Sequence, residues 1–329
     1  MADTVLVTGA NGFLGRHLVA ELLRRNCAVR ALLRPGTAPP FPAAWAVEYV
    51  EADLTRPATL AGAAEGCAAI IHAAALAQVN PARNPAVWAV NLGGTEAVLR
   101  LARTAGVARL VYVGTANVFG FGPLARPGDE TRPYAGRRYG LDYMDSKRAA
   151  TSLVLRAVAQ EQLPAVLVHP TFMLGPQDAK PTSNALLLEL YRGRLPGYPP
   201  GGKNYVHVRD VAVATVNALS QGRVGESYIL GNENLSYQAA FQLMARVLQV
   251  PPPRWPLPAG LALLYGKICD VKARLTGQPA QLNAAMAAVV NDGHYFNPAK
   301  ARSELALLQT PIEQAVAEAM VWFKAHQYV

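Results

Sequence analysis

Cysteine is scarce in this chain, which has 329 residues and only three cysteines. Cys27, Cys67 and Cys269 lie far apart and form no CxxC pair, so the sequence predicts neither a disulfide framework nor a zinc site. The six histidines show no metal-ligand spacing either. We therefore expect no bound metal, and thiols that act as small apolar side chains in a reducing compartment, the cytoplasm.

Long hydrophobic runs are also missing. No stretch approaches the roughly 20 uncharged apolar residues that span a bilayer, and the nearest one, residues 257–275, is interrupted by Lys267 and Asp270. We expect this stretch to form a helix of the second half of the protein, with docking on a membrane surface as the weaker alternative. The first apolar run already begins at Thr4, which leaves no room for a signal peptide.

Acidic residues are outnumbered by basic ones, 22 against 31, which gives a net charge of +9. The basic residues are scattered, without a basic block interleaved with aromatics, so nucleic acid is not an expected partner. An anionic cofactor, substrate or surface accounts better for the charge. The rest of the composition, 51% hydrophobic and 16% charged, is ordinary for a globular protein.

The N-terminal part of the chain carries a strong strand–turn–helix pattern. Thr4–Thr8 is an apolar, β-branched run typical of a buried parallel strand, and the apolar residues of 14–23 repeat at helical spacing. Between them lie Gly9, Gly12 and Gly15. Glycines at these places allow the turn, the approach of the backbone to a pyrophosphate, and the close packing of helix on strand. The stretch predicts a phosphate cradle at a helix N-terminus.

The chain then alternates strands and helices, which predicts an α/β protein with a Rossmann-like, doubly wound parallel sheet. The second predicted strand ends at Arg34, where an acid that binds the adenosine ribose is expected. A guanidinium pairs with a ribose phosphate, so we predict NADP rather than NAD, although NAD stays open. The alternative is that Arg34 is a solvated strand end. Asp53, after the third strand, either accepts from the adenine amino group or caps a helix.

Three later positions suggest chemistry. Thr115 follows the fifth predicted strand, and the chemistry of open α/β sheets lies at such strand ends. Tyr143 and Lys147 are four residues apart and so share one face of a helix. Asn91 lies inside a helical run, where it either hydrogen-bonds neighbouring backbone to hold the site or is exposed.

Taken together, the motifs TGANGFLG, ADL, HAAA, VNLGGT, GTANVFG, YMDSK, HPTFMLGP and YVHVRDVA resemble those of the extended short-chain dehydrogenase/reductases, the NAD-dependent epimerase/dehydratase superfamily. The likeness covers essentially the whole chain. VRALLRPG, KPTSNALLLELYRGRLPGY and GESYILGNENLS resemble the branch of dihydroflavonol reductases and hopanoid-associated epimerases. This resemblance implies a Rossmann-like domain and a smaller C-terminal α/β substrate lobe.

The resemblance also implies roles for single residues. Tyr143 is the expected acid/base, Lys147 binds the nicotinamide ribose and lowers the pKa of the tyrosine, and Thr115 holds the substrate oxygen. Asn91 is expected to complete the catalytic set. The predicted cofactor-binding residues are Gly9, Asn11, Gly12, Phe13, Leu14, Gly15, Arg34, Asp53, Leu54, Ala73, Ala74, Ala75, Tyr143, Lys147, Pro170, Thr171 and Phe172.

We place the NAD(P)-binding domain at residues 1–175, joined by a segment of about 204–230 that returns to the sheet. Residues 176–329 are then mainly a substrate-binding lobe. His207, in the returning segment, is expected to be a buried anchor rather than a catalytic residue. The run 310–326 is amphipathic and predicts a packing helix. Contact with a membrane surface and a homodimer both stay open.

Two functions remain. The first is an NADP(H)-dependent oxidoreductase acting on a ketone, aldehyde or secondary alcohol, with an apolar pocket expected at 186–190 and 261–265. The second is a nucleotide-sugar epimerase with tightly bound NAD(P). Sugar dehydratases of the family carry Asp-Glu where this chain has Ala116 and Asn117, so elimination is not expected. Lys203 stands where sugar-nucleotide members usually place an arginine that clamps a diphosphate. Arg126, Arg137 and Arg138 could help to bind such a diphosphate, or they could be solvated loop charges.

Overall fold

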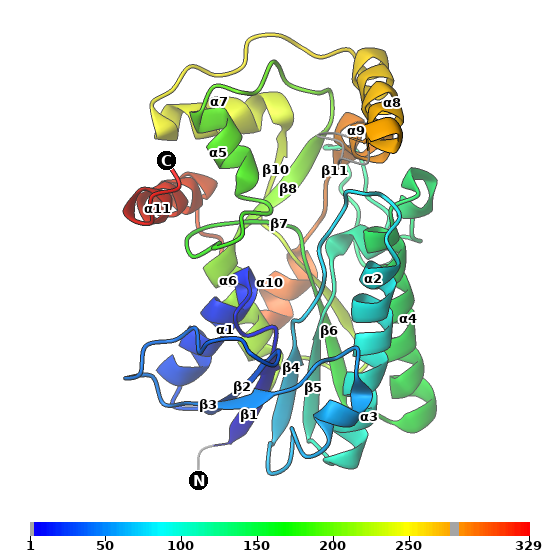
Figure 1. Ribbon diagram of the computed structural model, residues 1–329, viewed down its shortest axis with the longest axis vertical. Coiled ribbons are helices and arrows are strands. Elements are labelled where there is room, and N and C mark those ends of the chain that lie inside the picture. Colours follow the sequence, from blue (N-terminus) through cyan, green and yellow to red (C-terminus); the bar gives the residue numbers. More distant parts are fainter. Residues whose placement is uncertain (1–2, 277–282) are drawn as a thin grey trace.

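The computed structural model describes residues 3–276 and 283–329, and its centre is a seven-stranded sheet in which every neighbouring pair is parallel (Figure 1). The strands lie in the order β3-β2-β1-β4-β5-β6-β9. Their bounds are β1 Thr4–Thr8, β2 Ala28–Leu33, β3 Val47–Glu51, β4 Ala69–His72, β5 Arg109–Val113, β6 Ala165–Pro170 and β9 Ser227–Leu230. The order reverses between β1 and β4, so the carboxyl ends of these two strands border the crevice where such sheets bind ligands.

Helices cover both faces of this sheet, as the uninterrupted apolar strands require. In β1, Val5 and Val7 pack toward one face and Leu6 toward the other. The first face is covered by α1 (Phe13–Arg24), α6 (Val208–Asn217) and α10 (Ala299–Leu305). The second face is covered by α3 (Gly94–Thr104) and α4 (Asp142–Glu161). A short helix, α2 (Pro85–Trp88), continues into α3 through a π-helical turn, η2 (Ala89–Gly93). The predicted fold class is confirmed.

A second, smaller sheet lies beyond the carboxyl ends of the first. Its strands are β7 (Phe172–Leu174), β8 (Gly202–His207), β10 (Glu233–Ser236) and β11 (Gly293–His294). The helices α5 (Ala185–Tyr191), α7 (Tyr237–Leu248) and α11 (Ile312–Ala325) share one core with this sheet. Two further helices, α8 (Ala259–Thr276) and α9 (Ala284–Asn291), pack on each other at the opposite side of the lobe (Figure 1). The short 3-10 helices are η1 (Pro57–Leu60), η3 (Ala116–Val118) and η4 (Gly136–Tyr139).

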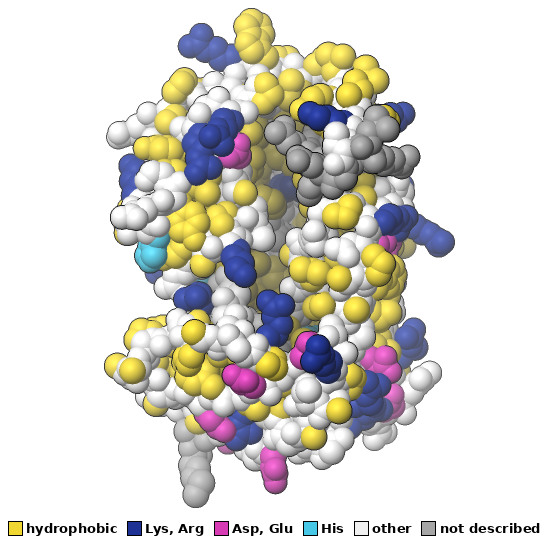
Figure 2. All heavy atoms as spheres, viewed as in Figure 1, with side chains coloured by type: hydrophobic (Ala, Val, Ile, Leu, Met, Phe, Trp, Pro, Cys, Tyr) yellow, Lys and Arg dark blue, Asp and Glu magenta, His cyan; other side chains and the backbone are white. Residues whose placement is uncertain are grey.

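The chain crosses between the two sheets more than once. The second sheet already includes β7, which lies before the predicted boundary at residue 175. It also includes β8, so the segment that returns to the main sheet runs from α6 to β9. Late in the chain, α10 returns again and packs against β9. Between the lobes Figure 2 shows a hollow, with hydrophobic side chains in its walls and Lys or Arg side chains at its edge.

The predicted helices of the second lobe form. In α11, Ala315 and Ala319 are buried and Trp322 is partly buried, which confirms a packing helix. The stretch from 257 forms α8, as expected, yet its outer face is exposed. Within the residues that the structure describes, no helix is long and apolar enough to cross a membrane.

Candidate active site

The glycine turn between β1 and α1 touches the end of β4. Gly9 has a φ of +70°, and a Cβ there would lie 2.7 Å from the N and Cα atoms of Ala74. A Cβ on Gly15 would overlap the backbone of Gly9 and Ala10. The first turn of α1 has no acidic residue, and no side chain caps it. Because no side chain caps the N–H groups of this turn, the cradle fits the pyrophosphate of a dinucleotide.

The other residues predicted near the cradle lie around it. Asn11 is exposed on the turn, Phe13 is partly buried and Leu14 is buried. Beyond β4, Ala73 and Ala74 are partly buried and Ala75 is exposed. Leu54 is a core residue that packs against Gly94 at the start of α3, so only its backbone is available to a cofactor.

A buried chain of hydrogen bonds connects these strand ends, and no motif in the sequence predicted it. The Thr8 hydroxyl accepts from Ala74 N (3.3 Å) and contacts His72 Nδ1 (2.7 Å). On the other side of the ring, His72 Nε2 lies 3.1 Å from the Thr95 hydroxyl, which donates to the Asn91 carbonyl (2.6 Å). Burial lowers the pKa of His72 to about 3, so this ring stays neutral and holds β1, β4 and η2 together. Thr8, His72 and Thr95 lie within recognisable motifs, but only the fold shows that they meet.

The buried Asn91 side chain connects two neighbouring segments by hydrogen bonds. Its side chain is 1% exposed, and its Oδ1 accepts from Leu76 N at 2.8 Å. Its Nδ2 donates to Leu76 O (3.2 Å) and to the Ser146 hydroxyl (3.1 Å). Of the two alternatives for this residue, the structure shows the hydrogen-bonded one. Since these partners use both ends of the amide, we assign Asn91 to positioning α4 rather than to contact with the reacting atoms, where the sequence placed it.

Thr115 and Tyr143 meet at the carboxyl end of β5. Thr115 is 7% exposed, precedes η3, and its side-chain oxygen accepts from Asn117 N at 3.4 Å. Tyr143 projects from the first turn of α4, and the Thr115 hydroxyl is close enough to act on the pKa of Tyr143. The strand end and the helix thus bring two hydroxyl-bearing side chains close together.

Lys147 lies one turn further along α4 and is almost completely buried, at 2% exposure. Its Nζ donates to Val113 O at 2.7 Å and lies 4.7 Å from the centre of the Tyr112 ring. Burial lowers the pKa of Lys147 to about 7. The ammonium can therefore lose its proton near neutral pH.

The expected pKa of Tyr143 needs correction. The resemblance implied that Lys147 lowers it, whereas burial raises the pKa of Tyr143 above its usual value and the Thr115 hydrogen bond only partly opposes this. The reason is geometric, because the Lys147 ammonium is directed to the Val113 carbonyl. In this structure the tyrosine is held as a protonated acid.

Arg34 and Asp53 lie near each other at the ends of β2 and β3. Arg34 is exposed, and its charge contributes to lowering the pKa of Asp53. The main cause of that lowering is the turn that follows, because Asp53 Oδ1 accepts from the N–H (2.9 Å) and hydroxyl (2.8 Å) of Thr55. Asp53 thus stabilises a turn with one oxygen, and it does not cap the helix that follows, η1, whose N-cap is Arg56.

The segment after β6 joins the two lobes. Pro170 ends β6, and Thr171 donates from its hydroxyl to Asn204 Oδ1 in β8 at 2.8 Å. Phe172 is partly exposed, and Lys203 Nζ lies 5.5 Å from its ring centre. This segment therefore offers a ring with a cation above it.

His207 is the buried anchor that the sequence predicted. It is 1% exposed, its Nδ1 accepts from Arg209 N at 3.0 Å, and its Nε2 lies 3.2 Å from a Glu318 carboxylate oxygen on α11. Burial lowers its pKa to about 4, so the ring is neutral and fixes β8 to α11.

Apolar side chains from three distant segments pack around Tyr143. The cluster contains Val79, Phe121, Tyr139 and Val289 together with alanines of α9. The pocket expected at 186–190 and 261–265 is wrong: Leu187, Leu188 and Leu190 belong to the core of the second lobe, and Leu261 and Leu264 are exposed on α8. The spacing of these apolar residues indicated helix faces, but it could not show which of those faces are buried.

Most of the basic side chains near the cluster around Tyr143 contact other side chains of the protein. Arg138 donates to Asp292 Oδ2 at 2.9 Å and lies over the Phe121 ring, 5.2 Å from its centre. Tyr139 also donates to Asp292 and lies 3.2 Å from His294 Nε2, whose Nδ1 contacts Asn117 Oδ1 at 3.1 Å. Lys203 is partly buried, and burial lowers its pKa to about 8.

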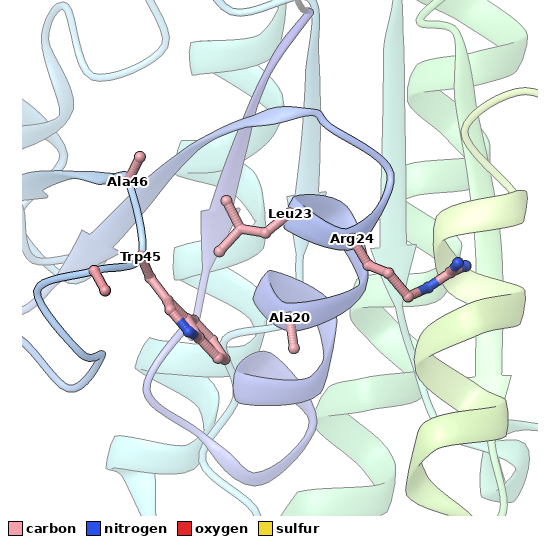
Figure 3. Close-up of a pocket in the computed structure, with 6 residues that line it drawn as sticks. Ala20, Leu23, Arg24, Trp45 and Ala46 are labelled. Carbon is pink, nitrogen blue, oxygen red and sulfur yellow. The ribbon is translucent and has the colours of Figure 1, made fainter.

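A separate depression of about 330 Å³ lies far from this chemistry, between the C-terminal half of α1 and the segment before β3 (Figure 3). It is lined by Ala20, Leu23, Arg24, Ala44, Trp45 and Ala46. Arg24, its only charged side chain, donates to Glu21 at 2.7 Å. Its lining supplies no reactive group.

The seven-stranded sheet, the glycine cradle and the Thr115, Tyr143 and Lys147 side chains define a dinucleotide-dependent enzyme of the extended short-chain dehydrogenase/reductase class. The model of the NAD dependent epimerase/dehydratase family matches residues 5–231, and the chain belongs to that family. Its members include NAD(P)-dependent oxidoreductases and epimerases, so the chain is an enzyme of this kind.

Three proteins illustrate the range of similar chains. The putative dihydroflavonol 4-reductase of Synechocystis is 31% identical, over 100% of this chain and 97% of the relative. Sterol demethylase protein B of Methylococcus capsulatus is 29% identical, over 98% of both. The crystal structure of a nucleoside-diphosphate-sugar epimerase from Pseudomonas aeruginosa superposes with a TM-score of 0.82 at 25% identity, covering 100% of this chain and 99% of the other.

Proposed function

We propose that this protein is an NADP(H)-dependent oxidoreductase that interconverts a lipophilic ketone or aldehyde and the corresponding alcohol. One observation carries the proposal: Tyr143, close to the Thr115 hydroxyl, packs in a cluster with apolar side chains from the 79–82 segment, Phe121 and α9. A carbonyl compound with an alicyclic or aromatic body fits such walls. The names of the two relatives above, a dihydroflavonol reductase and a sterol demethylase protein, support an alicyclic or aromatic substrate.

In this proposal the chain's own residues orient the substrate and move its proton. Thr115 and Tyr143 hydrogen-bond the carbonyl oxygen, and Tyr143 donates its proton to that oxygen during reduction. Lys147 binds the nicotinamide ribose, while the glycine cradle binds the pyrophosphate. The bound cofactor supplies the hydride. The raised pKa of Tyr143 keeps it protonated, as a proton donor requires.

Arg34→Asp should reverse the preference for NADPH over NADH. A charge-assisted hydrogen bond to the ribose phosphate contributes about 1.5–3 kcal/mol, so the ratio of the two affinities should fall by roughly one to two orders of magnitude. Titration by cofactor fluorescence measures both. Arg246→Asp, on an exposed position of α7, changes the net charge equally and should leave the ratio unchanged. An unaltered ratio in Arg34→Asp would remove this side chain from cofactor recognition.

A substrate screen tests the reaction itself. We expect NADPH to be consumed with alicyclic or aromatic ketones and aldehydes, and the same compounds to raise the melting temperature when NADP is present. Sugars linked to UDP, dTDP or GDP should give little stabilisation. Their diphosphate would need a pair of cations, whereas Arg138 is held by Asp292 and Lys203 is a point charge.

The second candidate is nucleotide-sugar epimerisation, favoured by the epimerase structure from Pseudomonas aeruginosa and by Lys203 at the cleft. It predicts a strong melting shift with a nucleotide sugar and product formed without consumption of added cofactor. That pair of results would replace the reductase proposal.

A further inference from the structure

Exposed hydrophobic side chains gather in one part of the molecule. Among the described residues, eleven large hydrophobic side chains are exposed, and six of these lie between 255 and 271. They are Trp255 at 72%, Leu261 at 61%, Leu264 at 55%, Tyr265 at 49%, Ile268 at 57% and Val271 at 55%. Single exposed apolar residues are normal, but a group of this kind marks an interaction surface.

Five of the six form one stripe along α8. Leu261, Leu264, Tyr265, Ile268 and Val271 recur at spacings of three and four, so at about 100° per residue they cover about one third of the helix circumference. We call these five residues the α8 stripe. The opposite side of α8 packs on α9: Gly266 is buried against Ala284, and Asp270 accepts from Ala284 N at 3.0 Å. The α8 stripe therefore faces away from the protein.

The charges beside the α8 stripe are positive. Residues 251–276 contain four basic residues and one acid, Asp270, whose carboxylate is directed to α9. Arg254, Lys267 and Lys272 are exposed. The chain as a whole carries +9. Two copies of so basic a surface would repel each other, whereas an anionic surface would attract both.

The place of α8 in the fold suits a docking helix. It lies at the end of the molecule opposite the N-terminus, on the outer side of α9 (Figure 1). Hydrophobic and basic side chains are exposed over this end in the space-filling view (Figure 2). An aromatic residue, Trp255, precedes the helix, and indole rings favour the interface of a bilayer.

From this geometry we infer that the α8 stripe, Trp255 and the flanking cations dock the protein onto the surface of an anionic lipid bilayer. The apolar side chains enter the boundary between headgroups and acyl chains, and Arg254, Lys267 and Lys272 contact the lipid phosphates. On its other side α9 packs in the cluster that contains Tyr143, so the docked face lies one helix away from the candidate active site.

Sedimentation with lipid vesicles tests the inference on the full chain. Wild-type protein should sediment with vesicles of phosphatidylglycerol and phosphatidylcholine, much less with phosphatidylcholine alone, and the difference should shrink as salt is raised. Ile268→Asp should lower the partition coefficient by roughly tenfold or more, because it places a charge among the inserted side chains. Lys267→Glu combined with Lys272→Glu should remove the preference for the anionic vesicles.

The matched control is Val321→Asp, because Val321 on α11 is an exposed apolar residue, at 70% against 57% for Ile268. It should bind vesicles like the wild type. Thermal melting followed by circular dichroism checks that each variant is folded. The inference is overturned if the wild type shows no preference for anionic vesicles, or if Ile268→Asp binds as Val321→Asp does. It is also overturned if light scattering shows a wild-type dimer that Ile268→Asp dissociates, because the stripe would then be a subunit interface.

Discussion

Tyr143→Phe is expected to lower turnover by roughly two to four orders of magnitude, the range that a positioned acid or base contributes. The substitution removes only the hydroxyl, and the ring keeps its packing in the apolar cluster. The glycine cradle and Lys147 are unchanged, so the affinity for NADPH should stay close to that of the wild type. Turnover with any accepted carbonyl compound, and cofactor titration, measure the two effects separately.

Tyr134→Phe is the matched control for this experiment. Tyr134 also belongs to the cluster around Tyr143, but its hydroxyl donates to Asp145 at 2.7 Å. Its removal should cost far less activity. If Tyr143→Phe turned over at the wild-type rate, Tyr143 would have no part in proton transfer. If it lost cofactor binding as well, the hydroxyl would serve the cofactor rather than the substrate.

Lys147→Met is expected to abolish most activity and weaken cofactor binding while it raises the stability of the fold. Burial places the pKa of Lys147 at about 7, against about 10.4 for a lysine in an unfolded chain. Below pH 7 Lys147 is protonated in both the folded and the unfolded state. The buried charge then lowers the free energy of unfolding by its full amount, on the order of a few kcal/mol. Methionine fills a similar volume without that cost, although the Val113 carbonyl loses its donor, at about 1 kcal/mol.

The sign of the pH dependence follows from the lowered pKa. Between about pH 7 and 10.4 the folded lysine is neutral while the unfolded one still binds a proton, so wild-type stability gains with pH across this window. The advantage of Lys147→Met should therefore be largest at or below pH 7 and decline toward pH 10. Melting temperatures of both proteins at pH 6 and pH 9.5 measure the change.

Lys180→Met serves as the control, since Lys180 is exposed and its removal should shift the melting temperature little at either pH. The Lys147→Met protein could instead be less stable than the wild type by the same amount at both pH values. That result would contradict the conclusion that the buried ammonium destabilises the fold. Retained activity would remove Lys147 from the site.

Local patterns predicted the backbone geometry of the glycine turn. Gly9 and Gly15 were expected where a side chain cannot fit, and Cβ atoms there would indeed meet the backbone of Ala74 and Ala10. Thr115 and Tyr143 were expected to serve one site, and the Thr115 hydroxyl is close enough to act on the pKa of Tyr143. The turn, the strand end and the helix face are each set by residues close together in the chain, whereas the fold brings Gly9 to Ala74 and Thr115 to Tyr143.

The substrate side was harder to predict because its walls come from segments far apart. Val79, Phe121 and Val289 meet around Tyr143, although more than 160 residues separate the last two. The apolar residues of 261–265 looked equally suitable in the sequence, yet the packing of α8 on α9 turns them outward. Apolar spacing shows that a helix has a stripe, but the neighbouring elements decide whether that stripe is covered.

By itself, then, the sequence determined the parallel sheet, the glycine cradle and the spacing of Thr115, Tyr143 and Lys147, because each depends on local backbone geometry. The tertiary structure alone decided that Asn91 braces α4 through Leu76 and Ser146, and that burial brings the pKa of Lys147 near neutrality while raising that of Tyr143. Hydrogen-bond partners and desolvation both depend on which distant segments surround a side chain, and only packing brings those segments together.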